Sequence, residues 1–213
     1  MGIKSLNLTL LGVLGCAAFG AQAAVDEPWL LRLRAVHMDM ANQSDPIPAL
    51  GVTASDTVHV SNKTIPEIDI SYFFTPNWAA ELVLTYPQRH NVTLVNNGTQ
   101  TSLGSFKHLP PVLSLQYHFK PGAVFQPYAG VGVNYTKISS VRLAAGAQPL
   151  DLESNSIGLS LNAGMDYRLS GNMYLNVDVK KIRLRSDVLA NGASVSKVKL
   201  DPLLIGVGVG WRF

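Results

Sequence analysis

The chain has 213 residues, the size of one domain, and 47% of them are hydrophobic. Its 17 basic and 14 acidic residues give a formal net charge of +3, which is too balanced for a nucleic-acid-binding protein. Only one cysteine is present, so no disulfide bond can form within the chain. The fold must therefore be stabilised by noncovalent contacts.

The first 23 residues are typical of a secretory signal peptide. Lys4 supplies a positive charge, an apolar run extends over residues 6–19, and Ala21-Gln22-Ala23 matches the A-x-A pattern of a cleavage site. The apolar run is short for a membrane-spanning helix. We predict that residues 1–23 are cleaved and that residues 24–213 form the mature protein, with 16 basic and 14 acidic residues.

Cys16 leaves a second interpretation of the leader open. Val13-Leu14-Gly15-Cys16 loosely resembles a lipoprotein processing site, in which the cysteine would be lipidated. The A-x-A site downstream is the better match, so we expect Cys16 to be removed with the leader. The mature chain would then have no cysteine to act as a nucleophile or a metal ligand.

Apolar and polar side chains alternate in segments of about ten residues along the rest of the chain, as in strands of a transmembrane barrel. Eight segments show this alternation, at residues 29–40, 66–74, 78–86, 109–119, 126–136, 156–169, 173–184 and 200–213. Short turns are expected at residues 75–77, 120–122 and 170–172. Longer polar loops are expected at residues 41–63, 88–107, 138–155 and 186–199. We predict an all-β fold: an eight-stranded antiparallel transmembrane β-barrel with short periplasmic turns and long extracellular loops.

A soluble β-barrel or sandwich, with the apolar face as its core, is the alternative. The other face is rich in glycine and carries both signs of charge, as a narrow filled lumen requires, so the membrane barrel is favoured. Aromatic residues near the short turns would form a periplasmic girdle. They are Tyr72, Phe74, Trp78, Tyr117, Phe119, Tyr167, Trp211 and Phe213.

Several stretches of the chain resemble a known family. They are residues 87–90 (PQRH), 108–111 (HLPP), 117–119 (YHF), 126–136 (QPYAGVGVNYT), 200–202 (LDP) and 210–213 (GWRF). Their order and spacing resemble the OmpW family of outer-membrane proteins along nearly the whole mature chain. The resemblance implies a barrel in the outer membrane of a Gram-negative bacterium that helps small hydrophobic molecules to cross. It also implies that the barrel-assembly machinery reads Trp211 and Phe213 as a C-terminal signal.

The inward-facing residues form two sets at different heights, in a lumen just wide enough for side chains or one small ligand. The lower set is charged and predicts a salt-bridged plug, because unpaired charges there would be costly; it comprises Arg32, Arg34, Asp69, Glu81, His118, Asp166, Arg168 and Arg212. The upper set predicts a pocket for apolar ligands; it comprises Val36, Met38, Met40, Val83, Val112 and Leu204. The alternative is that both sets only fill space.

The family resemblance also implies a hydrophobic constriction partway down the lumen. Val83 aligns with an aliphatic member of this gate, whereas Lys180 stands where an aromatic member is expected. Lys180 either extends outward to the membrane surface or pairs with Asp178 or Glu81.

Prolines indicate a way out of a lumen that is plugged below. Pro87 ends the third strand, Pro110-Pro111 begin the fourth, and Pro202 interrupts the top of the eighth. Because proline cannot donate a hydrogen bond to a neighbouring strand, we predict a lateral opening between the third and fourth strands near their outer ends. The alternative is that these prolines only begin and end strands.

Two other functions are alternatives to transport: an outer-membrane enzyme that modifies lipid A, such as an acyltransferase or deacylase, and a structural or adhesive barrel. An enzyme would need a nucleophile beside a base; the candidates are His37, His59, His90, His108, His118, Ser61, Ser105 and Ser114. No G-x-S-x-G motif is present, and His90 and His108 lack a metal-ligand spacing, so we predict no enzyme, no metal and no cofactor. A structural or adhesive barrel acting through its polar loops remains the main alternative. The expected partners are outer-membrane lipid, small hydrophobic ligands and the assembly machinery, and no pattern indicates an oligomeric state.

Overall fold

The computed structural model describes residues 25–46, 53, 56–96 and 99–213. The predicted signal peptide and Cys16 lie outside the described residues. Within the described ranges, no helix is long and apolar enough to cross a membrane.

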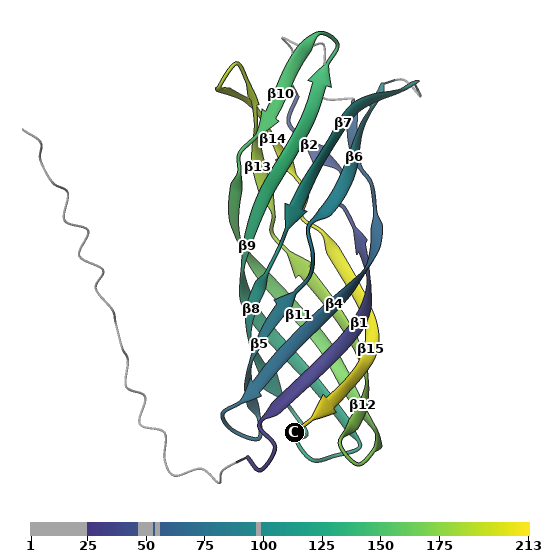
Figure 1. Ribbon diagram of the computed structural model, residues 1–213, viewed down its shortest axis with the longest axis vertical. Helices are drawn as coiled ribbons and strands as arrows, with labels where there is room; N and C mark the ends of the chain where they lie inside the picture. The colour runs from purple at the N-terminus through teal and green to yellow at the C-terminus, as the bar shows by residue number, and fades with distance from the viewer. Residues whose placement is uncertain (1–24, 47–52, 54–55, 97–98) are drawn as a thin grey trace, which may run out of the picture.

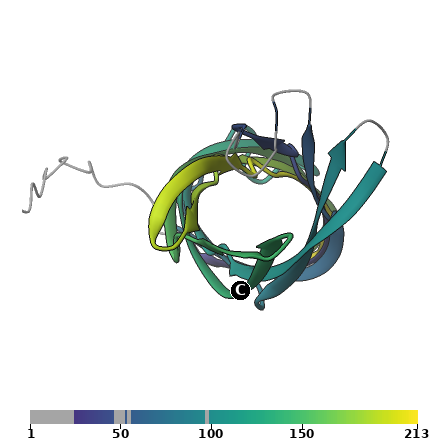
Figure 2. The ribbon, with the colours of Figure 1, turned by 90° about the horizontal axis from the view of Figure 1, so that it is seen from above.

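Eight strands form a closed antiparallel barrel, as Figure 1 and Figure 2 show. They are β1 (Trp29–Asp39), β4 (Lys63–Phe73), β5 (Trp78–Leu84), β8 (Val112–His118), β9 (Phe125–Ala145), β11 (Asn155–Ser170), β12 (Met173–Ile182) and β15 (Leu203–Arg212). Around the barrel the order is β11-β12-β15-β1-β4-β5-β8-β9, and β9 pairs with β11 to close the ring. Closure gives each strand a partner on both sides, which satisfies the backbone inside a bilayer. The predicted eight-stranded barrel is confirmed.

Buried and exposed side chains alternate along the strands. Many of the buried ones are polar or charged and most of the exposed ones are apolar, the reverse of a soluble barrel. On β1, Arg32 and Arg34 are buried while Leu33 between them is 44% exposed. The exposed belt continues around the barrel through residues such as Leu113 (59%) and Leu161 (61%). Charges therefore face the lumen and apolar side chains face lipid, which rules out the soluble alternative.

The short turns lie at the end of the barrel where the C-terminus is found (Figure 1), and most of the exposed aromatic residues belong to strand ends beside these turns. Trp29 packs on Tyr72 with ring centroids 4.8 Å apart, and Trp78 packs on Tyr117 at 4.9 Å. Trp211 is only partly exposed, whereas the other seven predicted girdle residues are exposed. Such pairs suit the boundary between lipid and water, because the ring of each residue is apolar while its O–H or N–H group can bind water.

At the opposite end, most of the predicted loops are β-structure. The additional strands are β2 (Gln43–Ser44), β3 (Thr57–Val60), β6 (Gln88–Asn96), β7 (Thr99–Leu109), β10 (Gln148–Leu152), β13 (Arg185–Ala190) and β14 (Ala193–Lys199). Figure 1 shows these hairpins continuing the barrel wall beyond the eight-stranded part. The predicted long polar segments are thus largely strands, because inward apolar residues such as Val92 and Phe106 pack on the same buried cluster as the barrel strands.

Candidate functional site

The inward-facing residues change in character from the periplasmic to the extracellular end of the barrel. On β1 the buried series is Leu30, then Arg32 and Arg34, then Val36 and Met38. Strands β4 and β12 repeat the order of apolar, charged and apolar positions. Because register aligns these strands, the lumen has three layers: a floor, a charged layer and an upper apolar lumen.

The floor is a small cluster that the sequence analysis missed. Leu30, Phe73, Ala79 and Tyr174 pack together. His118 lies beside it, with its ring 4.7 Å from Phe73 and 5.0 Å from Tyr128. The residues of the floor lie on the same inward face of their strands as the predicted plug. The alternation along the sequence could therefore have identified them.

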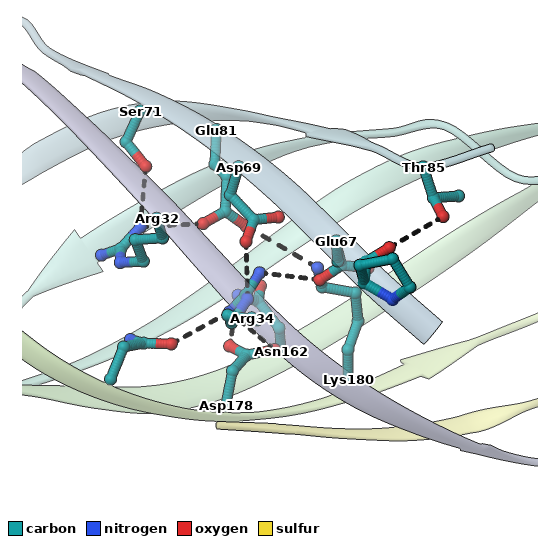
Figure 3. A network of polar contacts seen from close by, with 12 residues as sticks. Arg32, Arg34, Glu67, Asp69, Ser71, Glu81, Thr85, Asn162, Asp178 and Lys180 are labelled. Carbon is teal, nitrogen blue, oxygen red and sulfur yellow. Dashed lines mark hydrogen bonds and ion pairs between the residues drawn. The ribbon is translucent and has the colours of Figure 1, made fainter. Parts of the chain in front are cut away.

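In the charged layer, Arg32 is fully buried and binds partners from three strands. Figure 3 shows two of them, Ser71 and Glu81. Its Nη2 and Nε atoms donate to the two carboxylate oxygens of Asp166 at 2.7 and 3.1 Å. Its Nη1 atom lies 3.0 Å from Glu81 Oε2 and 2.8 Å from Ser71 Oγ. A bidentate guanidinium–carboxylate pair is among the strongest hydrogen-bonded pairs, and it fixes both side chains across the lumen.

Arg34 holds a second group of carboxylates in the charged layer. Its Nε atom lies 2.6 Å from Asp69 Oδ2, and Nη2 lies 3.0 Å from Glu67 Oε1. Its Nη1 atom lies 3.5 Å from Asp178 Oδ1. The facing residue on β15 is Gly208, where a Cβ atom would lie 2.8 Å from Arg34 Cγ. The glycine therefore provides the space that the arginine side chain occupies.

Lys180 points into the lumen and is 1% exposed. Its Nζ atom lies 3.8 Å from Glu81 Oε1. The outward orientation considered for this side chain is therefore wrong, because the inward position on β12 offers it a buried carboxylate. Tyr128, which the sequence analysis did not assign to the layer, donates its hydroxyl hydrogen to Asp178 Oδ2 at 2.9 Å.

Besides His118 at the floor, two residues predicted for the plug lie outside it. Arg168 donates to the Gly122 carbonyl oxygen at 2.7 Å, and Arg212 donates to the Glu27 carbonyl oxygen at 2.8 Å. Both line a hollow of about 540 Å³ at the periplasmic mouth, together with Tyr174. They occupy the last inward positions of their strands, below the floor, so they meet the periplasmic side instead of the buried carboxylates.

The six apolar residues of the predicted pocket lie in one buried cluster above the charged layer. Each is at most 4% exposed. Inward residues of the extracellular strands, among them Val60, Phe106 and Leu184, belong to the same cluster. Val83 and Val112 are opposite each other in the pairing of β5 with β8, at the top of that ladder.

Directly above that pair, the ladder between the third and fourth barrel strands is interrupted. Strands β5 and β8 pair up to Val83 and Val112, and the next pairing between these segments joins Gln88 to His108 on β6 and β7. In the part of the chain that the structure describes, no strand pairing joins residues 84–87 to residues 109–111. We call this break the seam; it contains Pro87, Pro110 and Pro111.

Pro202 does not belong to the seam. It precedes β15, which is separated from β5 by β1 and β4. Its carbonyl oxygen accepts a hydrogen bond from the Ile182 backbone N–H at 3.1 Å. The predicted contribution of Pro202 to the opening is therefore wrong, because it begins a strand on another side of the barrel.

A closed eight-stranded barrel with a lipid-facing apolar belt and a charged lumen defines an outer-membrane β-barrel protein. The model of the OmpW family matches residues 28–213. The chain belongs to the OmpW family, and it is located in the outer membrane. The predicted resemblance is confirmed.

Relatives and solved structures agree with this assignment. The outer-membrane protein y4mB of Sinorhizobium fredii is 41% identical over 197 residues, covering 90% of this chain and 82% of that protein. The dibenzothiophene metabolism operon protein PahQ of Pseudomonas aeruginosa is 24% identical over 205 residues, covering 89% and 90%. The crystal structure of OprG from Pseudomonas aeruginosa matches with a TM-score of 0.76 at 27% identity, covering 88% of this chain and 96% of that one.

Proposed function

We propose that the barrel gives small hydrophobic molecules passive passage through its upper apolar lumen and sideways through the seam into the bilayer. The observation that carries this proposal is the change of the lumen from apolar to charged at the height of the seam. Val83 and Val112 mark the boundary, since Glu81, two residues before Val83, already belongs to the charged layer.

The charged layer makes a straight path to the periplasm unfavourable for an apolar molecule. Passage would separate ion pairs such as Arg32–Asp166 and Arg34–Asp69, whose side chains are at most 2% exposed. Leaving a buried charge without its partner costs about 3–5 kcal/mol. We therefore assign the charged layer the role of a plug.

The upper lumen suits apolar ligands of varied shape. Met38 and Met40 are flexible thioethers that can repack around a guest, and both belong to the buried cluster. In this proposal Val83 acts as the aliphatic part of the gate. Lys180 lies beneath it as a member of the plug, so the gate has no aromatic partner at that position.

The seam supplies the exit. Prolines cannot donate to a ladder, and the carbonyl oxygen of Pro111 is engaged on the other side by the Tyr135 backbone N–H at 3.1 Å. Separating the two segments here breaks no strand pairing among the described residues. The relative PahQ is named as a protein of a dibenzothiophene metabolism operon, which supports a small apolar substrate class.

In the adhesive alternative, the extracellular hairpins would bind a partner. In the enzymatic alternative, a histidine beside a serine would activate it as a nucleophile. We propose that the chain is not an enzyme. His90 supports this, because its Nδ1 atom contacts the main-chain oxygen of Ser61 while the Ser61 hydroxyl accepts from the Asn91 N–H. We also retain cleavage of residues 1–23 and recognition of Trp211 and Phe213 by the assembly machinery as proposals.

Liposomes containing the purified barrel test passage directly. Entry of a labelled medium-length alkane or fatty acid ester should be faster than in protein-free liposomes, whereas entry of glucose should be unchanged. An adhesin would leave the permeability to both probes at the protein-free level, and that result would overturn the proposal.

A further inference from the structure

Two buried imidazoles lie beside the seam. His90 on β6 and His108 on β7 are each 0% exposed, and their ring centroids are 4.7 Å apart. The register places His90 opposite Phe106 and His108 opposite Gln88, so the two histidines are diagonal neighbours on the inward face. The Phe106 ring lies 5.9 Å from His90 and 6.2 Å from His108.

The hydrogen bonding of the pair leaves nitrogen lone pairs available. His90 Nδ1 lies 2.6 Å from the Ser61 carbonyl oxygen, so Nδ1 carries the proton and donates it. His90 Nε2 and both nitrogens of His108 are buried, and none has a hydrogen-bond partner among the described residues. A histidine whose Nδ1–H donates to a backbone carbonyl is oriented as a metal ligand through Nε2.

Both rings are held in the neutral form that coordinates metals. They lie on the extracellular hairpin, beyond the strands that cross the membrane. Burial lowers the pKa of His90, and burial together with the neighbouring His90 lowers the pKa of His108 to about 3. The positive charge of Lys63, on β4, lowers the pKa of both rings further.

We propose that His90 and His108 together bind one late first-row transition-metal ion, of the class of Cu²⁺ or Zn²⁺. Metal–nitrogen distances of about 2.0–2.1 Å place two ligating nitrogens about 3–4 Å apart, which rings at this separation reach by small rotations. Imidazole suits these ions, and affinity among them is highest for Cu²⁺. Among the described residues no third histidine, cysteine or carboxylate joins the pair, so water entering with the ion would have to complete its coordination. The site stands independently of the proposed transport.

Lys63 gives the site a second, distinctive property. Its charge acts on both rings and opposes a bound cation by Coulomb repulsion. Replacing it with an uncharged residue of similar length should therefore strengthen metal binding, an effect that a purely structural histidine pair would not show.

Titration calorimetry with CuCl₂ and ZnCl₂ on the purified barrel tests the site, together with electron paramagnetic resonance of the Cu²⁺ complex. The wild-type protein should bind one equivalent, with two coordinating nitrogens in the Cu²⁺ spectrum. His90→Asn and His108→Asn should each weaken binding about tenfold or more and remove one nitrogen. Lys63→Gln should tighten binding.

The chain offers matched controls in its other histidines. His37 and His59 are exposed, and His118 is buried at the floor, so His37→Asn, His59→Asn and His118→Asn should bind as the wild type does. Circular dichroism establishes that every variant is folded. Absence of binding by the folded wild type, or wild-type affinity in both His90→Asn and His108→Asn, would overturn the proposal.

Discussion

Arg34 on β1 and Asp69 on β4 form an ion pair with a distance of 2.6 Å between Nε and Oδ2, and neither side chain has exposed surface. The two residues are not opposite each other, because the register pairs Arg34 with Glu67 and Arg32 with Asp69. The guanidinium of Arg34 reaches diagonally and contacts both carboxylates, with Glu67 at 3.0 Å. One cation therefore offsets the repulsion between two acidic neighbours on the same strand.

Removal of this cation should destabilise the barrel strongly. Arg34→Met leaves Glu67, Asp69 and Asp178 without their shared partner, so the free energy of unfolding should fall by about 3–5 kcal/mol. Urea unfolding in lipid vesicles, followed by tryptophan fluorescence, measures the change. The control is Lys197→Met, whose ion pair with Asp187 is 51% and 32% exposed, with an expected change of at most about 1 kcal/mol. Equal losses in the two variants would contradict the role of Arg34.

The close approach of β15 to β1 can be tested at glycine. In Gly208→Ala the new methyl group would collide with the Leu33 carbonyl oxygen and with Arg34, so the folded yield should fall. Gly206→Ala is the control on the same face of the same strand, where the nearest atom, Val36 Cγ2, lies 3.2 Å away. Heat-modifiable migration on gels measures the folded fraction. A loss that is larger for Gly206→Ala than for Gly208→Ala would count against the packing described.

Closing the seam should stop lateral exit. Thr85 and Pro110 would be opposite each other if the β5–β8 register continued beyond Val83 and Val112, so a disulfide between cysteines at these two positions would join the segments across the seam. The double variant Thr85→Cys with Pro110→Cys should lose hydrophobic uptake when oxidised and regain it when reduced.

The matched control for the seam uses the same two strands. Ala80 and Leu115 are paired within the intact ladder, so Ala80→Cys with Leu115→Cys should form a disulfide without changing uptake. Unchanged uptake in the oxidised seam variant, with disulfide formation established by mass spectrometry, would refute exit through the seam.

The period of two was sufficient to predict the eight barrel strands, because polarity alternates most strictly where one face meets lipid. It did not predict the extracellular strands, since both faces of β6 and β7 carry polar residues and only tertiary packing on Phe106 and Val92 reveals the inward face. The alternation also placed Arg168 in the plug, wrongly. It shows which face of a strand a residue is on, but not the height at which the lumen ends.

Contacts between segments far apart in the sequence were also not predicted. The prolines alone do not show that two strands separate Pro202 from the seam. The sequential order of strands in the closed barrel does, because it places the eighth strand beside the first. His90 and His108 are likewise brought together only by the β6–β7 pairing. Glu67 and Asp178 alternate with apolar residues on β4 and β12. Their place in the charged layer could therefore have been predicted from the sequence.

The most direct test of the upper lumen as a hydrophobic path is uptake of a labelled medium-length alkane or fatty acid ester by cells. Cells with the wild-type barrel, Met40→Arg, Met40→Leu or no barrel would be compared at equal amounts of folded protein. Arginine at this buried position places an unpaired charge in the apolar path, whereas leucine conserves its volume and polarity. We predict rapid uptake with the wild type and Met40→Leu, and uptake with Met40→Arg no faster than without the barrel. Equal uptake by all four strains would contradict passage through the upper lumen.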